Sequence, residues 1–302
     1  MKAAHSREMN GFRIFFRRVA RQGSKGMAAA FRSSRFAGVA FAALAGLAFA
    51  GAARAETLRA QYSISLLGLP IGQATASGSV DRSAYKLKID TRLTGLAAVM
   101  SEFKAVLVAS GGMGAKGPLP AAFASTTATS KETRTLRMAL DAGTVKGLEI
   151  APPWIDPHPG RIPVAEDDKR NILDPISAMF MTVPAGASPT GPQACNRSIP
   201  IFDGYSRFAV TLSYVGERDV KVKGYAGPVA VCSARYVPVS GHRPDRKSTK
   251  FMAENRQIEA WLAPVAGTNV VAPLHVTMAT MAGTAVINAS EFSVSGGSAA
   301  AR

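Results

Sequence analysis

The chain has 302 residues, 47% of them hydrophobic, and is long enough to bury a sizeable core. Its formal net charge is +16, but residues 1–55 hold ten Lys and Arg residues against Glu8 alone. The rest of the chain carries 26 basic and 19 acidic side chains, a net charge of +7. This moderate charge lacks the dense basic surface of a nucleic-acid-binding protein, so no nucleic-acid partner is expected. Anionic envelope components or solubility alone would account for it.

The first 55 residues have the layout of a secretory signal peptide. Basic residues precede an apolar run, and the small-x-small triplet Ala53-Arg54-Ala55 closes it. No later segment approaches the ~20 apolar residues that span a bilayer, so the processed protein is not expected to span a membrane. Because the basic flank is long, Met27 is an alternative translation start, whereas Arg17-Arg18 lies too far from the apolar run to favour twin-arginine export. The sequence therefore predicts an exported, periplasmic protein.

Apolar and polar side chains alternate along much of the chain after residue 55, as in half-buried strands. This alternation is typical of antiparallel sheets with one apolar and one solvated face. Turn residues such as Asp203-Gly204 separate the alternating runs. We therefore expect an all-β fold, mainly antiparallel, with a single domain over residues 56–294 and a flexible tail over residues 295–302. The clearest runs are 85–93, 207–214, 219–223 and 257–262.

One segment interrupts the strand pattern. Asp174-Pro175 places an N-cap residue before a proline at the first helical position. Ile176, Met179 and Phe180 then follow at the spacing of one helix face. Proline-rich stretches on both sides, 152–159 and 184–192, cannot pair in a central strand. The pattern predicts one short helix over residues 174–181, brought to the sheet by irregular crossings.

The two cysteines, Cys195 and Cys232, both lie in the part of the chain expected outside the cytoplasm. An even pair without metal-type spacing is typical of a disulfide in an oxidising compartment. A redox-active or zinc-binding pair is the alternative, but it lacks a Cys-x-x-Cys motif and nearby histidine ligands. We expect a structural disulfide.

Several short motifs resemble those of exported bacterial proteins in the domain of unknown function 3108 family. They are the segment Tyr62–Gly72, the helix start Asp174–Ala178, Phe202-Asp203-Gly204 before a strand, and Gly227 with Cys232. The resemblance implies a periplasmic β-rich protein whose architecture is similar to that of lipoprotein carriers. In that architecture a strongly curved, open barrel of antiparallel strands wraps around a helix. The family supplies no catalytic residues.

The apolar interior is one candidate binding site. If the sheet closes incompletely around the predicted helix, a hydrophobic cleft could take a lipid or a lipid-modified partner, since methionine-rich surfaces adapt to varied apolar ligands. The alternative is that the same side chains form an ordinary filled core. The candidate lining residues are Trp154, Met179, Phe180, Met181, Phe103 and Phe208.

A basic cluster is the second candidate. It could contact anionic head groups or glycan phosphates, or it could be an exposed loop between strands. Its members are Arg243, Arg246, Lys247 and Lys250.

No metal, cofactor or catalytic site is expected. The histidines after residue 55 lack the spacing of a zinc site, and no Gly-x-Ser-x-Gly motif is present. Ser177 is more simply part of a helix start, and Glu166-Asp167-Asp168 part of a solvated turn. The sequence favours a non-catalytic envelope protein, with a purely protein-binding module or an envelope enzyme acting on a glycan as alternatives.

Overall fold

The computed structural model describes residues 56–81, 83–155 and 158–296. The predicted signal peptide (1–55) and residues 297–302 of the predicted tail lie outside the described residues, while Ser295 still belongs to the last strand. Antiparallel strands dominate, as the alternation of apolar and polar side chains predicts. Within the described ranges, no helix is both long and apolar enough to cross a bilayer.

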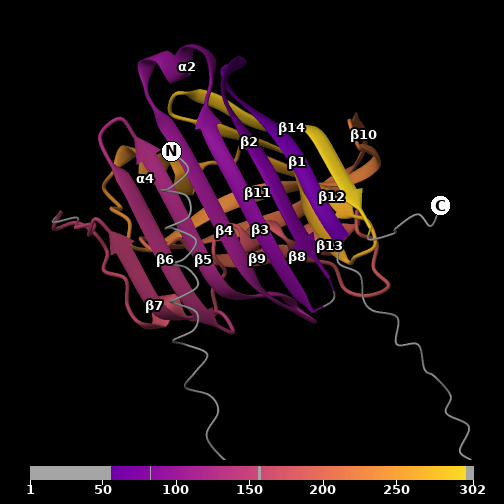
Figure 1. The fold of residues 1–302 in the computed structure, drawn as a ribbon, viewed down its shortest axis with the longest axis horizontal. Coiled ribbons are helices and arrows are strands. Elements are labelled where there is room, and N and C mark those ends of the chain that lie inside the picture. Colours follow the sequence, from indigo (N-terminus) through magenta and orange to yellow (C-terminus); the bar gives the residue numbers. More distant parts are fainter. Residues whose placement is uncertain (1–55, 82, 156–157, 297–302) are drawn as a thin grey trace, which may run out of the picture. The chain divides into compact units, whose positions relative to one another are not determined.

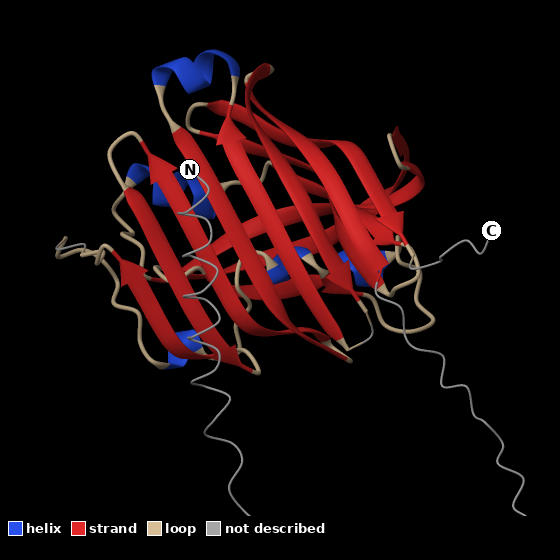
Figure 2. Cartoon of the chain, viewed as in Figure 1, coloured by secondary structure: helices blue, strands red, loops and turns tan. Residues whose placement is uncertain are grey.

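Fourteen strands form one sheet (Figures 1 and 2). Thirteen of them follow the order β7-β6-β5-β4-β3-β2-β1-β14-β13-β12-β11-β10-β9, and β8 pairs with β13. The strands are β1 (Glu56–Leu66), β2 (Leu69–Val80), β3 (Ala84–Leu93), β4 (Phe103–Gly114), β5 (Gly117–Thr129), β6 (Thr133–Asp141), β7 (Thr144–Ala151), β8 (Met181–Thr182), β9 (Arg197–Phe202), β10 (Arg207–Val222), β11 (Tyr225–Ser240), β12 (Ile258–Val265), β13 (Val270–Thr280) and β14 (Gly283–Ser295).

The sheet bends strongly but does not close. β7 and β9 are its two ends, and they do not pair with each other. Figure 1 shows the yellow strand β14 beside β1, and orange strands such as β11 running behind the earlier strands at an angle. Apart from β1 and β14, the neighbours along this order are successive in the sequence, and most are joined by short turns, with α2 between β3 and β4 and α4 between β11 and β12. The expected open, curved antiparallel sheet is thus confirmed.

The helices are short: α2 (Gly95–Met100), α3 (Pro192–Cys195), α4 (Lys247–Glu254) and the 3-10 turns η1 (Asp167–Lys169) and η2 (Ser177–Met179). The helix expected over 174–181 was wrong in length, since only η2 forms there. Phe180 N–H bonds to the Ser177 carbonyl, and Met181 then pairs with Val271 of β13, which ends the turn. Pairing with the sheet overrides the helical apolar spacing. In the predicted basic cluster, Arg243 and Arg246 lie in the connection before α4, whereas Lys247 and Lys250 belong to α4.

The crossing segment between β7 and β9 fills the concave side of the sheet. Ile172, Ile176 and Phe180 belong to one buried cluster with side chains of β1–β6 and β11–β14. Ala178 and Met181 belong to a second cluster with side chains of β9–β13. Successive residues of the segment therefore complete both halves of the core.

A buried polar chain fixes this segment to the sheet. Asp174 Oδ1 accepts hydrogen bonds from the backbone N–H groups of Ile176 (3.0 Å) and Ser177 (2.9 Å). The Ser177 hydroxyl donates to Asp174 Oδ2 and lies 2.6 Å from the Tyr85 hydroxyl of β3. Because Asp174 and Ser177 are fully buried, losing any partner would leave a polar group unsatisfied in the core.

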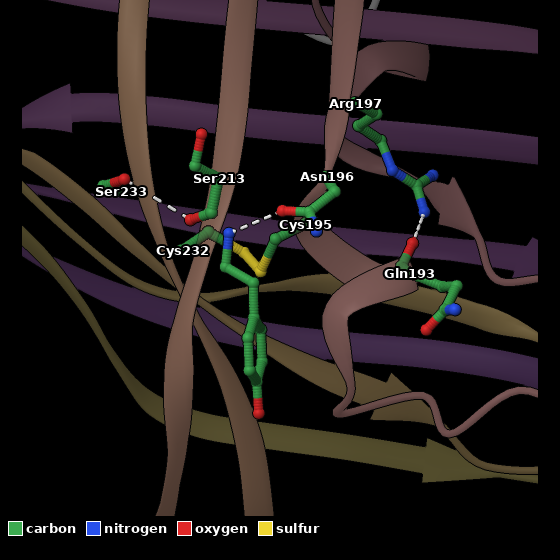
Figure 3. Close-up of a disulfide and its surroundings, with 8 residues drawn as sticks. Gln193, Cys195, Asn196, Arg197, Ser213, Cys232 and Ser233 are labelled. Atoms are coloured by element: carbon green, nitrogen blue, oxygen red, sulfur yellow. Dashed lines mark hydrogen bonds between the residues drawn. A yellow bond between two sulfur atoms is a disulfide. The ribbon is translucent and has the colours of Figure 1, made fainter.

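The predicted disulfide between Cys195 and Cys232 is present, and both residues are fully buried. It joins the end of α3 to β11, with Cα atoms 5.5 Å apart. Beside it, Asn196 Oδ1 accepts a hydrogen bond from Tyr214 N–H (2.8 Å), and the Arg197 guanidinium donates to the Gln193 carbonyl (Figure 3). The disulfide therefore holds the end of the crossing segment against the sheet.

Reduction of the disulfide should destabilise the fold. A cross-link spanning 37 positions restricts the unfolded chain enough to stabilise the native state by about 3–4 kcal/mol. Urea unfolding with and without reductant should show this loss. The Cys195→Ser/Cys232→Ser double variant cannot form the cross-link. With and without reductant, its stability should therefore be close to that of the reduced wild type. Equal stability of the oxidised and reduced wild type would contradict the prediction.

Asp174 should make stability fall as pH rises. Burial raises its pKa above the ordinary value of 3.8, although its hydrogen bonds partly oppose the shift. The folded state therefore binds the proton more tightly than the unfolded state, so this stabilisation is complete below the unfolded pKa and is lost as pH rises through the folded pKa. Urea unfolding from pH 4 upward should show the wild type losing stability relative to Asp174→Asn. If the difference in unfolding free energy between the wild type and Asp174→Asn did not vary with pH, the raised pKa of Asp174 would be contradicted.

Candidate functional site

The structure does not gather the residues of the proposed apolar cleft into one site. Phe180 lies in the first buried cluster, whereas Met181 belongs to the second and Phe208, which is partly buried, packs against the second. Met179 points outward with 41% of its surface exposed. Phe103, at the start of β4, is half-buried. Trp154, the sixth member, lies on the wall of a separate surface pocket.

That pocket has a volume of about 360 Å³, within the range of small-molecule sites. It opens at the end of the sheet where β5 and β6 meet. Its lining residues are Ser125, Thr127, Thr129, Glu132, Arg134, Trp154 and Tyr205.

One wall of the pocket is a row of hydroxyl groups on β5. Ser125, Thr127 and Thr129 occupy alternate positions, so they share one face of the strand. Phe123, two positions earlier on that face, belongs to the buried core. The concave face of β5 thus changes from apolar core to hydroxyl row as the strand leaves the interior.

Two aromatic rings also line the pocket. The rings of Trp154 and Tyr205 meet edge to face with centroids 5.1 Å apart. The Arg161 guanidinium lies 4.0 Å from the Trp154 ring centroid and donates a 2.7 Å hydrogen bond to the Tyr205 carbonyl. Arg161 therefore holds together a residue of the β7–β9 connection and a residue of the β9–β10 turn.

A tight turn places Tyr205. Asp203 Oδ1 accepts hydrogen bonds from the N–H groups of Tyr205 (2.8 Å) and Ser206 (2.7 Å). Gly204 has φ +94°, and a Cβ there would collide with Leu136 of the core. Burial raises the pKa of Asp203, while these backbone bonds and Arg161 oppose the rise. The turn residues are therefore fixed by local hydrogen bonds and by contact with the core.

Arg134 supplies the positive charge of the pocket. Its guanidinium forms a 2.6 Å ion pair with Glu132, and its buried Nε has no hydrogen-bond partner among the described residues. Burial raises the pKa of the Tyr205 hydroxyl, whereas Arg134 beside it acts in the opposite direction. The pocket thus offers hydroxyl groups, a phenol and a guanidinium donor beside aromatic rings, groups that suit a hydroxyl-rich ligand.

The predicted basic cluster begins next to this pocket. Gly241 N–H bonds to the Ile162 carbonyl (2.8 Å), and Gly241 accepts from the Ser206 hydroxyl (3.1 Å). A Cβ at Gly241 would collide with the Tyr205 carbonyl. Arg243 follows two residues later and is half-buried, whereas the other three cluster members, Arg246, Lys247 and Lys250, are exposed on and before α4.

The described residues offer little support for a metal site or for a catalytic site. No group of three or more potential metal ligands occurs there. Glu132 is the one carboxylate among the residues lining the pocket, whereas glycoside hydrolysis ordinarily uses a pair. Ser177 is buried in the core beside Asp174 and Tyr85.

Trp154 could be identified as a candidate from the sequence, whereas its partners in the pocket could not. Arg134 on β6 and Tyr205 in the β9–β10 turn have no local sequence signal, because they meet only when distant parts of the chain fold together. A usable signal did exist for β5, because the alternating face of the strand changes from Phe123 to three hydroxyl residues in succession.

The comparisons with known proteins identify a family without an assigned activity. Residues 61–290 match the family described as "Protein of unknown function (DUF3108)". No functionally curated protein gives a significant match. A solved structure, the β-barrel-like protein of domain of unknown function DUF1849 from Brucella abortus, is 14% identical with a TM-score of 0.48, covering 81% of this chain and 100% of that one. The chain belongs to the DUF3108 family, as its short motifs suggest.

Proposed function

We propose that this protein is a non-catalytic periplasmic protein of the cell envelope that binds an anionic glycan in the pocket beneath Trp154 and Tyr205. The observation that carries the proposal is a single pocket lined by the hydroxyl row of β5, two aromatic rings and the Arg134 guanidinium. The disulfide and the signal-peptide pattern support a place outside the cytoplasm.

The chemistry of the lining supports a glycan over an apolar ligand. Sugars present hydroxyl groups that exchange hydrogen bonds with Ser and Thr, and their C–H faces fit against aromatic rings. The cluster of Arg243, Arg246, Lys247 and Lys250 begins two residues after Gly241, which packs against the Tyr205 turn, and it favours a ligand that also carries negative charge. The single carboxylate of the lining supports binding in preference to hydrolysis. A lipid cleft has less support, because Phe180 and Met181 are buried in two separate parts of the core.

The first test is a fluorescence titration. The chain has two tryptophans, so Trp261→Phe leaves Trp154 as the only reporter. Muropeptide disaccharides, which are anionic, should change Trp154 fluorescence at lower concentration than neutral chitin oligosaccharides do. No change with either probe would reject the proposed pocket.

The second test measures the lining residues by calorimetry. Thr127→Val removes one hydroxyl and should weaken muropeptide binding about 3- to 10-fold, and Arg134→Gln about 10- to 100-fold. Thr277→Val, on β13 and outside the pocket, is the matched control and should bind as the wild type does. Equal affinities for Thr127→Val and Thr277→Val would contradict the assignment.

The proposed location has its own test. If export removes the predicted signal peptide, the protein purified from the envelope should begin at Glu56. N-terminal sequencing checks this. A protein recovered from the cytoplasm with an intact N-terminus would exclude the periplasmic assignment.

A further inference from the structure

Large apolar side chains are exposed at one end of the sheet, on three neighbouring connections that no site described above uses. These connections are the β1–β2 turn, α2 between β3 and β4, and the β13–β14 turn (Figure 1). We call their exposed apolar side chains the apolar rim. Each is between 60% and 82% exposed: Leu67, Leu69, Leu96, Val99, Met100 and Met281.

The three connections lie side by side. Leu67 N–H donates a 2.9 Å hydrogen bond to the Thr284 carbonyl, which joins the β1–β2 turn to the β13–β14 hairpin. Thr94 N–H donates to the Ile71 carbonyl (3.1 Å), which joins the start of α2 to β2. The backbone under the rim is therefore held by hydrogen bonds, although α2 itself has no buried residue.

The rim has an uncharged tip above cationic side chains. Residues 60–80 and 93–101 contain no charged residue, and residues 260–290 contain only His275 among ionisable types other than Tyr and Cys. On the adjacent strands Arg92 and Lys104 are exposed and face each other in register. Lys131 lies exposed in the β5–β6 turn at the same end. Of the acidic residues there, Glu102 is exposed and Glu132 is paired with Arg134.

We propose that the apolar rim docks this protein onto the surface of an anionic phospholipid bilayer. Aliphatic side chains that protrude above cations can enter the boundary between head groups and acyl chains while the cations remain with the lipid phosphates. A protein partner is a poorer fit, because protein interfaces favour aromatic side chains and the rim has none. This inference is independent of glycan binding.

Vesicle co-sedimentation tests the proposal, with the chain as cells produce it. Wild type should bind vesicles of phosphatidylglycerol mixed with phosphatidylcholine more tightly than phosphatidylcholine alone. Leu96→Asp/Val99→Asp should lower the partition coefficient roughly 100-fold, since each side chain contributes about 10-fold. Val215→Asp, at a side chain also 60% exposed but on β10, is the control and should bind as wild type does. Arg92→Ser/Lys104→Ser should weaken binding to anionic vesicles only, about 5-fold per residue.

A second readout reports on the rim itself. In Val99→Trp, the added tryptophan should shift its emission to shorter wavelength on anionic vesicles and be quenched by brominated lipid. Binding that the aspartate variants leave unchanged would overturn the proposal. So would a dimer in sedimentation that Leu96→Asp/Val99→Asp dissociates, because a second copy would then cover the rim. The rim variants should bind muropeptide with the affinity of the wild type. Muropeptide binding therefore tests the glycan proposal separately from membrane docking.

Discussion

An antiparallel sheet that bends without closing must cover its apolar concave face with its own chain. Here the segment between β7 and β9 does so, and the hydrogen-bonded chain from Asp174 through Ser177 to Tyr85 fixes its position. Because successive residues of the segment complete two parts of the core, a shift along the sheet would misplace both sets. The disulfide restrains the far end of the same crossing. Most of the fold thus depends on the position of one mostly irregular segment.

The parts of the fold that follow local rules could be predicted from the sequence. Tyr85 and Leu87 alternate with lysines and are buried as that pattern requires, because the side chains of a strand point to alternate faces. The Cys195–Cys232 pair was predictable because the chain offers no other cysteine. Asp174 was correctly recognised as a residue that satisfies backbone N–H groups at the start of a turn.

The parts that depend on distant contacts could not be predicted. Ile176, Met179 and Phe180 have helical spacing, but the length of the turn was set by Met181 pairing with β13, about 90 residues later in the chain. Tyr205 and Trp154 meet through Arg161, and none of the three carries a local signal of that approach. Exposure of the rim was equally hidden, since Leu96 and Val99 would suit a buried strand as well as a surface helix. Alternation shows which face a side chain occupies, but not whether another part of the chain covers it.

The contact of Gly204 with Leu136 gives the pocket an energetic connection to the interior. Leu136 is one of the most deeply buried side chains, and the turn that carries Tyr205 lies directly on it. A ligand that binds Tyr205 would therefore also stabilise the packing of this turn on Leu136. Because it binds the folded state, it would raise the melting temperature as its concentration rises. The reverse also holds by thermodynamic linkage. Replacements that loosen the packing around Leu136 would weaken the affinity of a pocket that they never touch.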